Sequence, residues 1–184
     1  MPNWCYNYAK CTFPSEELYL KFLSSIDEKN LFMTFAPLCL GKDISMNDIY
    51  DYHTACIKWK TKWEPIDVNI MLQDNDTFEI EFSFDTAWSP PTGVYEIMAR
   101  EHKIYTTSNY YENGQQYFGM CCYDENVETN ISYDYPTSIE ELEQIKNEIG
   151  LGSELDDFMS PIWEQLIEDW LENESDEEKD EEKK

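Results

Sequence analysis

Four aromatic and cationic residues are the strongest candidates for chemistry: Trp59, Lys62, Trp63 and Trp88, with Asp85 close to the last of them in the sequence. Aromatic faces stack on a base or ring, and a lysine ammonium pairs with a phosphate or a carboxylate. The group therefore predicts a site for a small molecule such as a nucleotide or a signal. In the competing interpretation the tryptophans pack in the core and Lys62 pairs with Asp85.

The sequence offers little for catalysis or for binding a metal. The only histidines are His53 and His102, and the six cysteines include no pair with the CxxC spacing of a zinc site. A nucleophilic pair of Cys56 with His102 has no further support, and no glycine-rich phosphate loop occurs. We therefore expect a protein that is not an enzyme, with no cofactor, no metal and reduced thiols.

The charge balance points to the kind of partner. The chain has 184 residues, of which 39 are acidic and 13 basic, for a net charge of −26, and Arg100 is its single arginine. Direct nucleic-acid binding is not expected, because neutralising phosphates requires Lys and Arg. Short apolar runs and an N-terminus without a signal-peptide pattern predict a cytoplasmic protein with no membrane segment. Its partner is expected to be a protein with a basic surface.

The most regular apolar stripe of the chain runs from Leu155 to Leu171 and predicts a helix, with a kink or restart at Ser160-Pro161. Opposite the stripe lies an acidic face, which is the candidate partner-binding surface; its residues are Asp156, Asp157, Glu164, Glu168, Asp169 and Glu172. The stripe packs on the domain in one interpretation. In the other it forms a homodimer through Trp163 and Trp170.

The remaining pattern predicts an α+β fold. Expected strands are Trp4 to Thr12, one or two between Ala55 and Leu72, Phe78 to Phe84, and a hairpin around Asn113-Gly114. Helices are expected after Ser15, after Pro90-Pro91, and from Ser138 to Gly150, with a loop-rich insert over residues 31–52. This organisation divides the chain into a domain over 1–123, an acidic helical extension packed on it over 124–173, and a disordered acidic tail over 174–184.

Four motifs in order resemble the YubB-like proteins of plasmids and phages. They are Met1 to Asn7 (MPNWCYN), Trp59 to Glu64 (WKTKWE), Phe84 to Pro91 (FDTAWSPP), and Tyr111 to Gly114 (YENG) followed by Phe118-Gly119. The resemblance covers residues 1–123 and implies a ferredoxin-like domain, meaning an antiparallel sheet with helices on one face. It also implies a mobile-element origin. The chain departs from the family pattern at Lys60 and Glu64, where the family usually has Gly and Asp.

Charge and resemblance together suggest a function. We expect a non-enzymatic viral or mobile-element protein that binds and inhibits a host defence or nucleic-acid-binding protein, with carboxylates placed as a DNA mimic would place them. The alternative is capture of a nucleotide or signal by the Trp59, Lys62, Trp63 and Trp88 group.

Overall fold

The computed structural model describes residues 3–38 and 50–181, with side chains up to residue 171. Contacts divide the chain into two compact units, Met1–Tyr133 and Asp134–Lys184. The boundary lies later than the sequence indicated, because the stretch after residue 123 adds a further strand to the sheet of the first unit.

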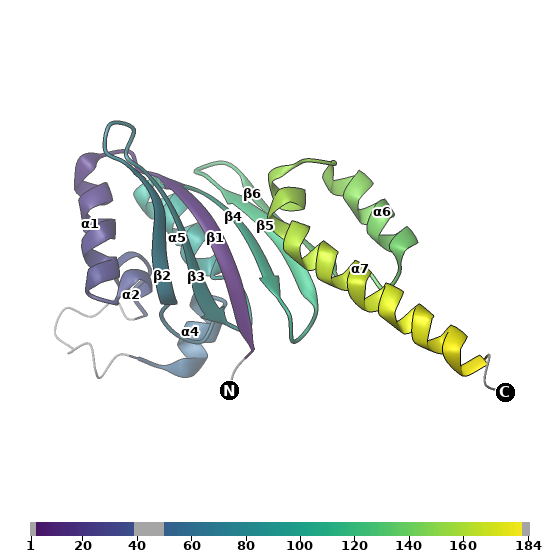
Figure 1. Ribbon diagram of the computed structural model, residues 1–184. Helices are drawn as coiled ribbons and strands as arrows, with labels where there is room; N and C mark the ends of the chain where they lie inside the picture. The colour runs from purple at the N-terminus through teal and green to yellow at the C-terminus, as the bar shows by residue number, and fades with distance from the viewer. Residues whose placement is uncertain (1–2, 39–49, 182–184) are drawn as a thin grey trace. The chain divides into compact units, whose positions relative to one another are not determined.

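The first unit is built on a six-stranded antiparallel sheet (Figure 1). Its strands are β1 (Trp4–Thr12), β2 (Ile66–Asp74), β3 (Glu79–Ala87), β4 (Tyr105–Glu112), β5 (Tyr117–Tyr123) and β6 (Glu128–Asp134), in the order β2-β3-β1-β4-β5-β6. Its helices are α1 (Glu16–Asp27), α2 (Leu31–Phe35), α4 (Tyr52–Lys58) and α5 (Thr92–His102).

The first four strands and two helices have the ferredoxin-like order β1-α1-β2-β3-α5-β4. Each helix connects two strands that are not neighbours, so β1 lies between β3 and β4 and pairs with both. Strands β5 and β6 extend the sheet beyond β4. The expected α+β class and ferredoxin-like domain are therefore confirmed.

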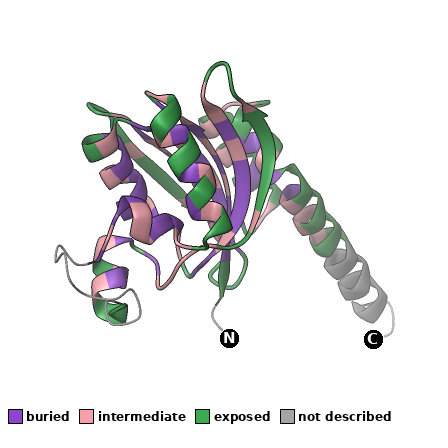
Figure 2. Ribbon diagram, turned by 90° about the vertical axis from the view of Figure 1, so that its left-hand side faces the viewer, coloured by how far each residue is buried: buried purple, intermediate pink, exposed green. Residues whose placement is uncertain are grey.

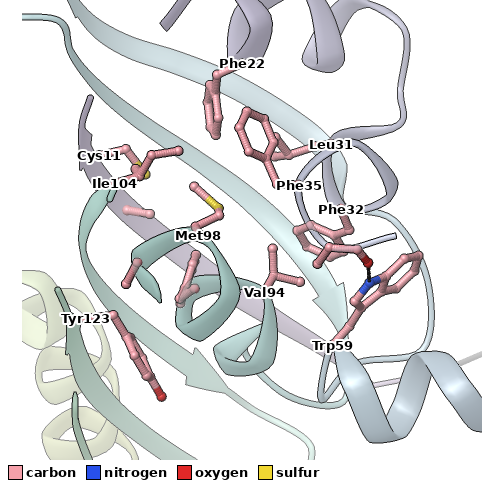
Figure 3. Packing of buried hydrophobic residues seen from close by; sticks show 14 of the residues in the cluster. Cys11, Phe22, Leu31, Phe32, Phe35, Trp59, Val94, Met98, Ile104 and Tyr123 are labelled. Atoms are coloured by element: carbon pink, nitrogen blue, oxygen red, sulfur yellow. Dashed lines mark hydrogen bonds between the residues drawn. The ribbon is translucent and has the colours of Figure 1, made fainter. Parts of the chain in front are cut away.

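The core lies on the face of the sheet that the helices cover. Alternate residues of the central strands point into it, among them Cys11 on β1 and Phe82 on β3. They pack with Phe22 of α1, Phe35 of α2 and Met98 of α5 (Figure 3). Figure 2 shows helices that are buried on one side and exposed on the other, which is the pattern that amphipathic periodicity predicts.

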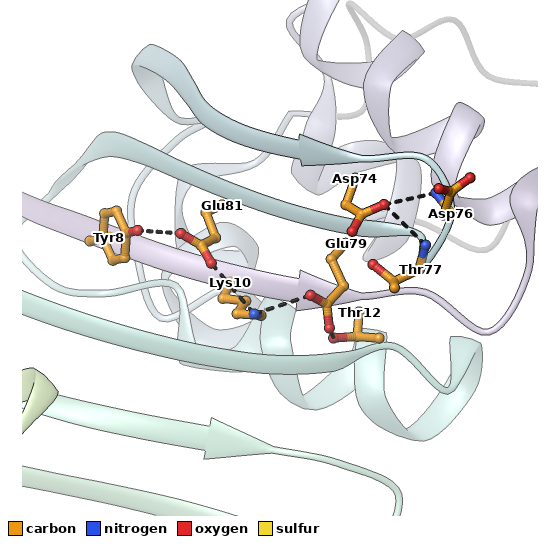
Figure 4. A network of polar contacts seen from close by, with 8 residues as sticks. All are labelled: Tyr8, Lys10, Thr12, Asp74, Asp76, Thr77, Glu79 and Glu81. Atoms are coloured by element: carbon orange, nitrogen blue, oxygen red, sulfur yellow. Dashed lines mark hydrogen bonds and ion pairs between the residues drawn. The ribbon is translucent and has the colours of Figure 1, made fainter.

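The opposite face of the sheet carries polar side chains in register. Lys10 on β1 lies opposite Glu81 and pairs with both Glu79 and Glu81 at 3.1 and 3.4 Å (Figure 4). The Tyr8 hydroxyl donates to the second Glu81 oxygen at 2.6 Å. The strand predicted over Phe78 to Phe84 is thus confirmed as β3, with its acidic residues on the uncovered face.

Of the one or two strands predicted between Ala55 and Leu72, the structure has one, β2, while residues 52–58 form helix α4. The carboxylate of Asp51 caps this helix by accepting from the backbone N–H of Thr54 at 2.8 Å and from its hydroxyl at 2.6 Å. Ala55 and Trp59, four residues apart, then face the core. The predicted insert holds the short helix α2, and residues 39–49 of it lie outside the described residues.

The predicted hairpin at Asn113-Gly114 is confirmed and joins β4 to β5. Its turn is held by the buried Glu112, whose two carboxylate oxygens accept from the N–H groups of Gly114 at 2.7 Å and Gln115 at 2.6 Å. Strand β6 follows, from a stretch that the sequence assigned to the helical extension.

The second unit contains α6 (Ile139–Ile149) and α7 (Glu154–Glu181). Ser138 caps α6, as predicted, and Gly150 ends it with φ of 88°. Helix α7 does not restart at Pro161. Pro161 has no N–H to donate to the carbonyl of Asp157, four residues earlier, and the helix continues past this missing hydrogen bond. The helix continues to Glu181, within the stretch where disorder was predicted.

Gly93 is a position where a methyl group cannot fit. A Cβ there would lie 2.0 Å from the Lys58 carbonyl oxygen, at the end of α4. We expect Gly93→Ala to lower the free energy of unfolding by about 2 kcal/mol, because the backbone of Lys58 and Trp59 has to shift. Urea unfolding followed by circular dichroism measures this, with Ala99→Gly in the same helix as a control for helix propensity. A Gly93→Ala variant as stable as the parent would contradict the close approach.

Candidate functional site

Three aromatic rings surround the ammonium group of Lys62. Its Nζ atom lies 4.6 Å from the ring centroid of Trp63, 5.0 Å from that of Trp88 and 5.1 Å from that of Tyr52. These distances are within the range at which a cation is attracted to the face of a ring. We call Lys62, Tyr52, Trp63 and Trp88 the Lys62 cage.

The rings of the cage pack against each other and remain open to solvent. Tyr52 meets Trp88 edge to face at 6.4 Å, and Trp4 of β1 lies 6.1 Å from Trp63. Tyr52 and Trp88 are each 37% exposed and Trp4 is 36% exposed. Large aromatics that gather on a surface at this exposure indicate a contact site for a ligand or a partner.

The loop after α4 fixes the backbone that carries the cage. Trp59 is fully buried and its Nε1 donates to the Ala36 carbonyl at 2.7 Å (Figure 3). The buried Thr61 hydroxyl donates to the Ala87 carbonyl at 2.8 Å. Lys62 and Trp63 follow these two anchors in the loop and are only partly buried.

The next anchor is Glu64, which caps helix α2. Its two carboxylate oxygens accept from the N–H groups of Phe32 at 2.7 Å and Met33 at 2.8 Å. Burial raises the pKa of this carboxyl to about 7, although both hydrogen bonds act to lower it. Glu64 therefore has a structural role as a helix cap.

One residue of the cage and one close to it in the sequence hold left-handed backbone. Lys60 has φ of 67° and Trp88 has φ of 72°, a conformation that is costly for residues with a Cβ. Trp88 is held there from both sides, because its N–H donates to the Asn3 carbonyl at 2.9 Å and its carbonyl accepts from the Tyr117 hydroxyl at 2.6 Å. Gly is the residue that adopts this conformation most readily, so the side chain at position 60 adds to its cost.

The structure brings together three of the five residues predicted for the small-molecule site: Lys62, Trp63 and Trp88. Trp59 lies in the core. Asp85 lies on the uncovered face of the sheet, opposite Tyr6 and Ile66, where burial and the nearby Asp67 raise the pKa of its carboxyl. Tyr52 was missed by the sequence analysis. The aromatic residues between Tyr50 and His53 are only a weak signal for a site. Tyr52 lies beside Trp88 because it is the first residue of α4.

The acidic residues predicted on the last helix have different surroundings. Asp157, Glu164, Glu168 and Asp169 are exposed, and the first three lie on one face of α7 by their spacing. Asp156 is buried and accepts from the Trp163 indole at 3.1 Å and from the Gly152 N–H at 3.0 Å. It therefore has a role inside the second unit. The side chain of Glu172 lies outside the described residues.

The two tryptophans proposed for a homodimer also differ. Trp163 is 2% exposed and donates to Asp156, whereas Trp170 is half-buried. The homodimer stays a prediction.

Most of the described cations are already engaged. Lys10, Arg100, Lys103 and Lys146 each pair with a carboxylate, and Lys58 donates to the Pro37 carbonyl at 2.5 Å. These five cations are therefore less available to neutralise phosphates.

Three buried thiols, Cys5, Cys11 and Cys121, are poor nucleophiles. Burial raises the pKa of Cys5 and of Cys11 to about 12 and raises that of Cys121 further, so all three stay protonated near neutral pH. The His102 ring lies edge to face with Phe35, with its Nε2 3.2 Å from the carbonyl oxygen of that residue. Within residues 3–38 and 50–171, no three His, Cys, Asp or Glu side chains are grouped so as to hold a metal.

Comparison with known proteins identifies the family. Residues 58–150 match the family described as the ferredoxin-like domain in Api92-like protein, and the chain belongs to this family. The matched stretch reaches α6, further than the motifs of residues 1–123. The crystal structure of the protein api92 from Yersinia pseudotuberculosis is similar, with 9% identity and a TM-score of 0.46 over 75% of this chain and 99% of that one. No curated protein matches.

None of the described helices is long and apolar enough to cross a membrane.

Proposed function

We propose that the protein is a non-enzymatic binding protein of a phage or plasmid that blocks a basic surface of a host defence or nucleic-acid-binding protein in the host cytoplasm. The observation that supports this most directly is the exposed acidic face of α7, formed by Asp157, Glu164 and Glu168. The net charge of −26 steers a basic partner toward such a face.

The charges along this face of α7 are spaced more widely than the phosphates of a nucleic-acid strand. At about 1.5 Å of rise per residue, the steps from Asp157 to Glu164 and from Glu164 to Glu168 are roughly 10 and 6 Å. A nucleic-acid strand carries one charge per about 3.4 Å of helix axis. The helix is thus less densely charged than a strand, and binding is expected to depend on side-chain contacts as well as on charge.

Neutralising this face tests the proposal. We expect the triple variant Asp157→Asn, Glu164→Gln and Glu168→Gln to lose at least tenfold in affinity for the partner, because three attractive charges are removed. Asp156 is left intact because it is buried. The measurement is capture of proteins from a bacterial lysate by the tagged chain, followed by titration of the captured protein.

A matched variant controls for net charge. Asp27→Asn, Asp76→Asn and Glu101→Gln change the same number of exposed acids in the first unit. Equal loss from both triple variants, or capture that survives high salt, would argue against a specific acidic face. Displacement of the captured protein by double-stranded DNA would show that the two compete for one surface, and failure to displace it would limit the proposal to inhibition without mimicry.

A second function, capture of a small molecule, is favoured by one specific observation. The Lys62 cage gathers partly exposed aromatic rings from α4, from the loop after it and from the end of β3, and its Trp88 holds strained backbone. Strain of this kind persists where the surrounding structure imposes it, often at ligand sites.

A further inference from the structure

We propose that the Lys62 cage is a binding site for an organic ammonium ion with methylated nitrogen, and that the side chain of Lys62 occupies the site until the ligand displaces it. This inference rests on the small-molecule function proposed above and names its ligand class.

The chemistry of the rings favours such a cation. The faces of Trp and Tyr carry negative electrostatic potential, and rings arranged around one point attract an ammonium group placed there. Lys62 shows where that point is, since its Nζ lies between 4.6 and 5.1 Å from three ring centroids. A methylated ammonium is less strongly hydrated than the ammonium of lysine, so it gives up less on leaving water for the same rings.

The charge of the molecule disfavours an anionic ligand such as a nucleotide. A net charge of −26 concentrates cations near the surface and repels phosphates. Next to the cage, Asp51 precedes Tyr52, and hydrogen bonds from Thr54 lower the pKa of its carboxyl, which keeps it ionised. A phosphate that binds Lys62 would have to approach through the negative potential of the protein.

Lys62 is held in a way that permits displacement. Among the residues that the structure describes, no carboxylate forms an ion pair with its ammonium, and the ring contacts are its interactions there. Its flexible stem lets the ammonium move into water. The rings do not depend on Lys62 for their position, because hydrogen bonds to Ala36 and Ala87 fix the loop and those of Asn3 and Tyr117 fix Trp88.

The test is removal of the internal cation. Tetramethylammonium chloride is titrated into the full chain and followed by tryptophan fluorescence and by NMR shifts of the indole N–H groups, with sodium chloride at equal concentration as the reference. We expect Lys62→Ala to bind tetramethylammonium about tenfold more tightly than the parent, since the ligand no longer competes with an internal ammonium. Lys60→Ala, an exposed lysine in the same loop, is expected to leave the affinity unchanged.

Loss of a ring provides the opposite change. Tyr52→Ala removes an exposed ring at the start of α4 and is expected to weaken binding several-fold without unfolding the chain. Tetramethylammonium bound no more tightly by Lys62→Ala than by the parent would overturn the inference. Adenosine monophosphate bound by the parent but not by Lys62→Ala would also overturn it while leaving small-molecule capture in place. Binding of neither probe by any variant would overturn both.

Discussion

Replacing Trp59 by alanine is expected to lower the free energy of unfolding by about 4 kcal/mol, the typical cost of removing a buried tryptophan. The side chain is 0% exposed and its ring meets Phe32 edge to face at 5.6 Å. The change also leaves the Ala36 carbonyl without the indole donor, which is 2.7 Å away in the parent.

Urea unfolding measures this loss, and Trp63→Ala is the matched control. Trp63 lies in the same loop, but it is only partly buried, so we expect a loss of about 1 to 2 kcal/mol. Trp59→Phe separates the two contributions of Trp59, because it keeps an aromatic ring and removes the N–H donor. The assignment of Trp59 to the core would be contradicted by equal losses from Trp59→Ala and Trp63→Ala.

The two tryptophans show a limit of sequence analysis at this site. Both lie in one short motif and have the same side chain. The sequence therefore offered no reason to assign one of them to the core and the other to a ligand site. The structure separates them because Trp59 directly follows α4, four residues after the buried Ala55, while Trp63 lies in the loop. That difference depends on recognising α4 as a helix. The aromatic and basic segment from Ala55 to Trp63 was instead grouped with the following β-branched segment as one or two strands.

Elements with strong local signals were predicted correctly. The alternation in β1 and β3, the Ser15 cap of α1, the Asn113-Gly114 turn and the Ser138 cap of α6 each involve residues close together in sequence. Strand β6 was missed, because its residues 128–134 are mostly exposed and polar and show no clear apolar face. It forms because β5 has an edge that is free to pair, and the local sequence of β6 does not show this.

Two neighbouring residues of α7 also have different roles that the sequence does not distinguish. Asp156 and Asp157 are neighbours of identical type, and the periodicity of the helix places them about 100° apart. Asp157 is exposed, whereas Asp156 serves the Trp163 indole and a backbone N–H. A carboxylate that accepts hydrogen bonds from buried donors cannot be told apart by sequence from the other acidic residues, of which the chain has 39 in all.

Glu64 is expected to make the stability of the protein depend on pH between about 4.5 and 7. Its folded-state pKa of about 7 lies above the ordinary value of 4.5, so the folded state binds a proton more tightly than the unfolded state. Below about pH 4.5 both states are protonated at this site. As the pH rises from there, the unfolded state releases its proton first, and stability falls until the folded state is also ionised near pH 7.

Glu64→Gln isolates this effect, because glutamine cannot ionise and its carbonyl oxygen still accepts from one of the N–H groups of Phe32 and Met33. We expect the stability of Glu64→Gln relative to the parent to increase by about 2 to 3 kcal/mol between pH 4 and pH 8. Urea unfolding of both proteins across this range is the measurement. Glu64→Ala is the control: it removes the same titration and both caps of α2, so it should share the pH trend while being less stable than Glu64→Gln throughout. A difference between parent and Glu64→Gln that stays constant from pH 4 to pH 8 would show that desolvation does not govern this carboxyl and that its two hydrogen bonds outweigh burial.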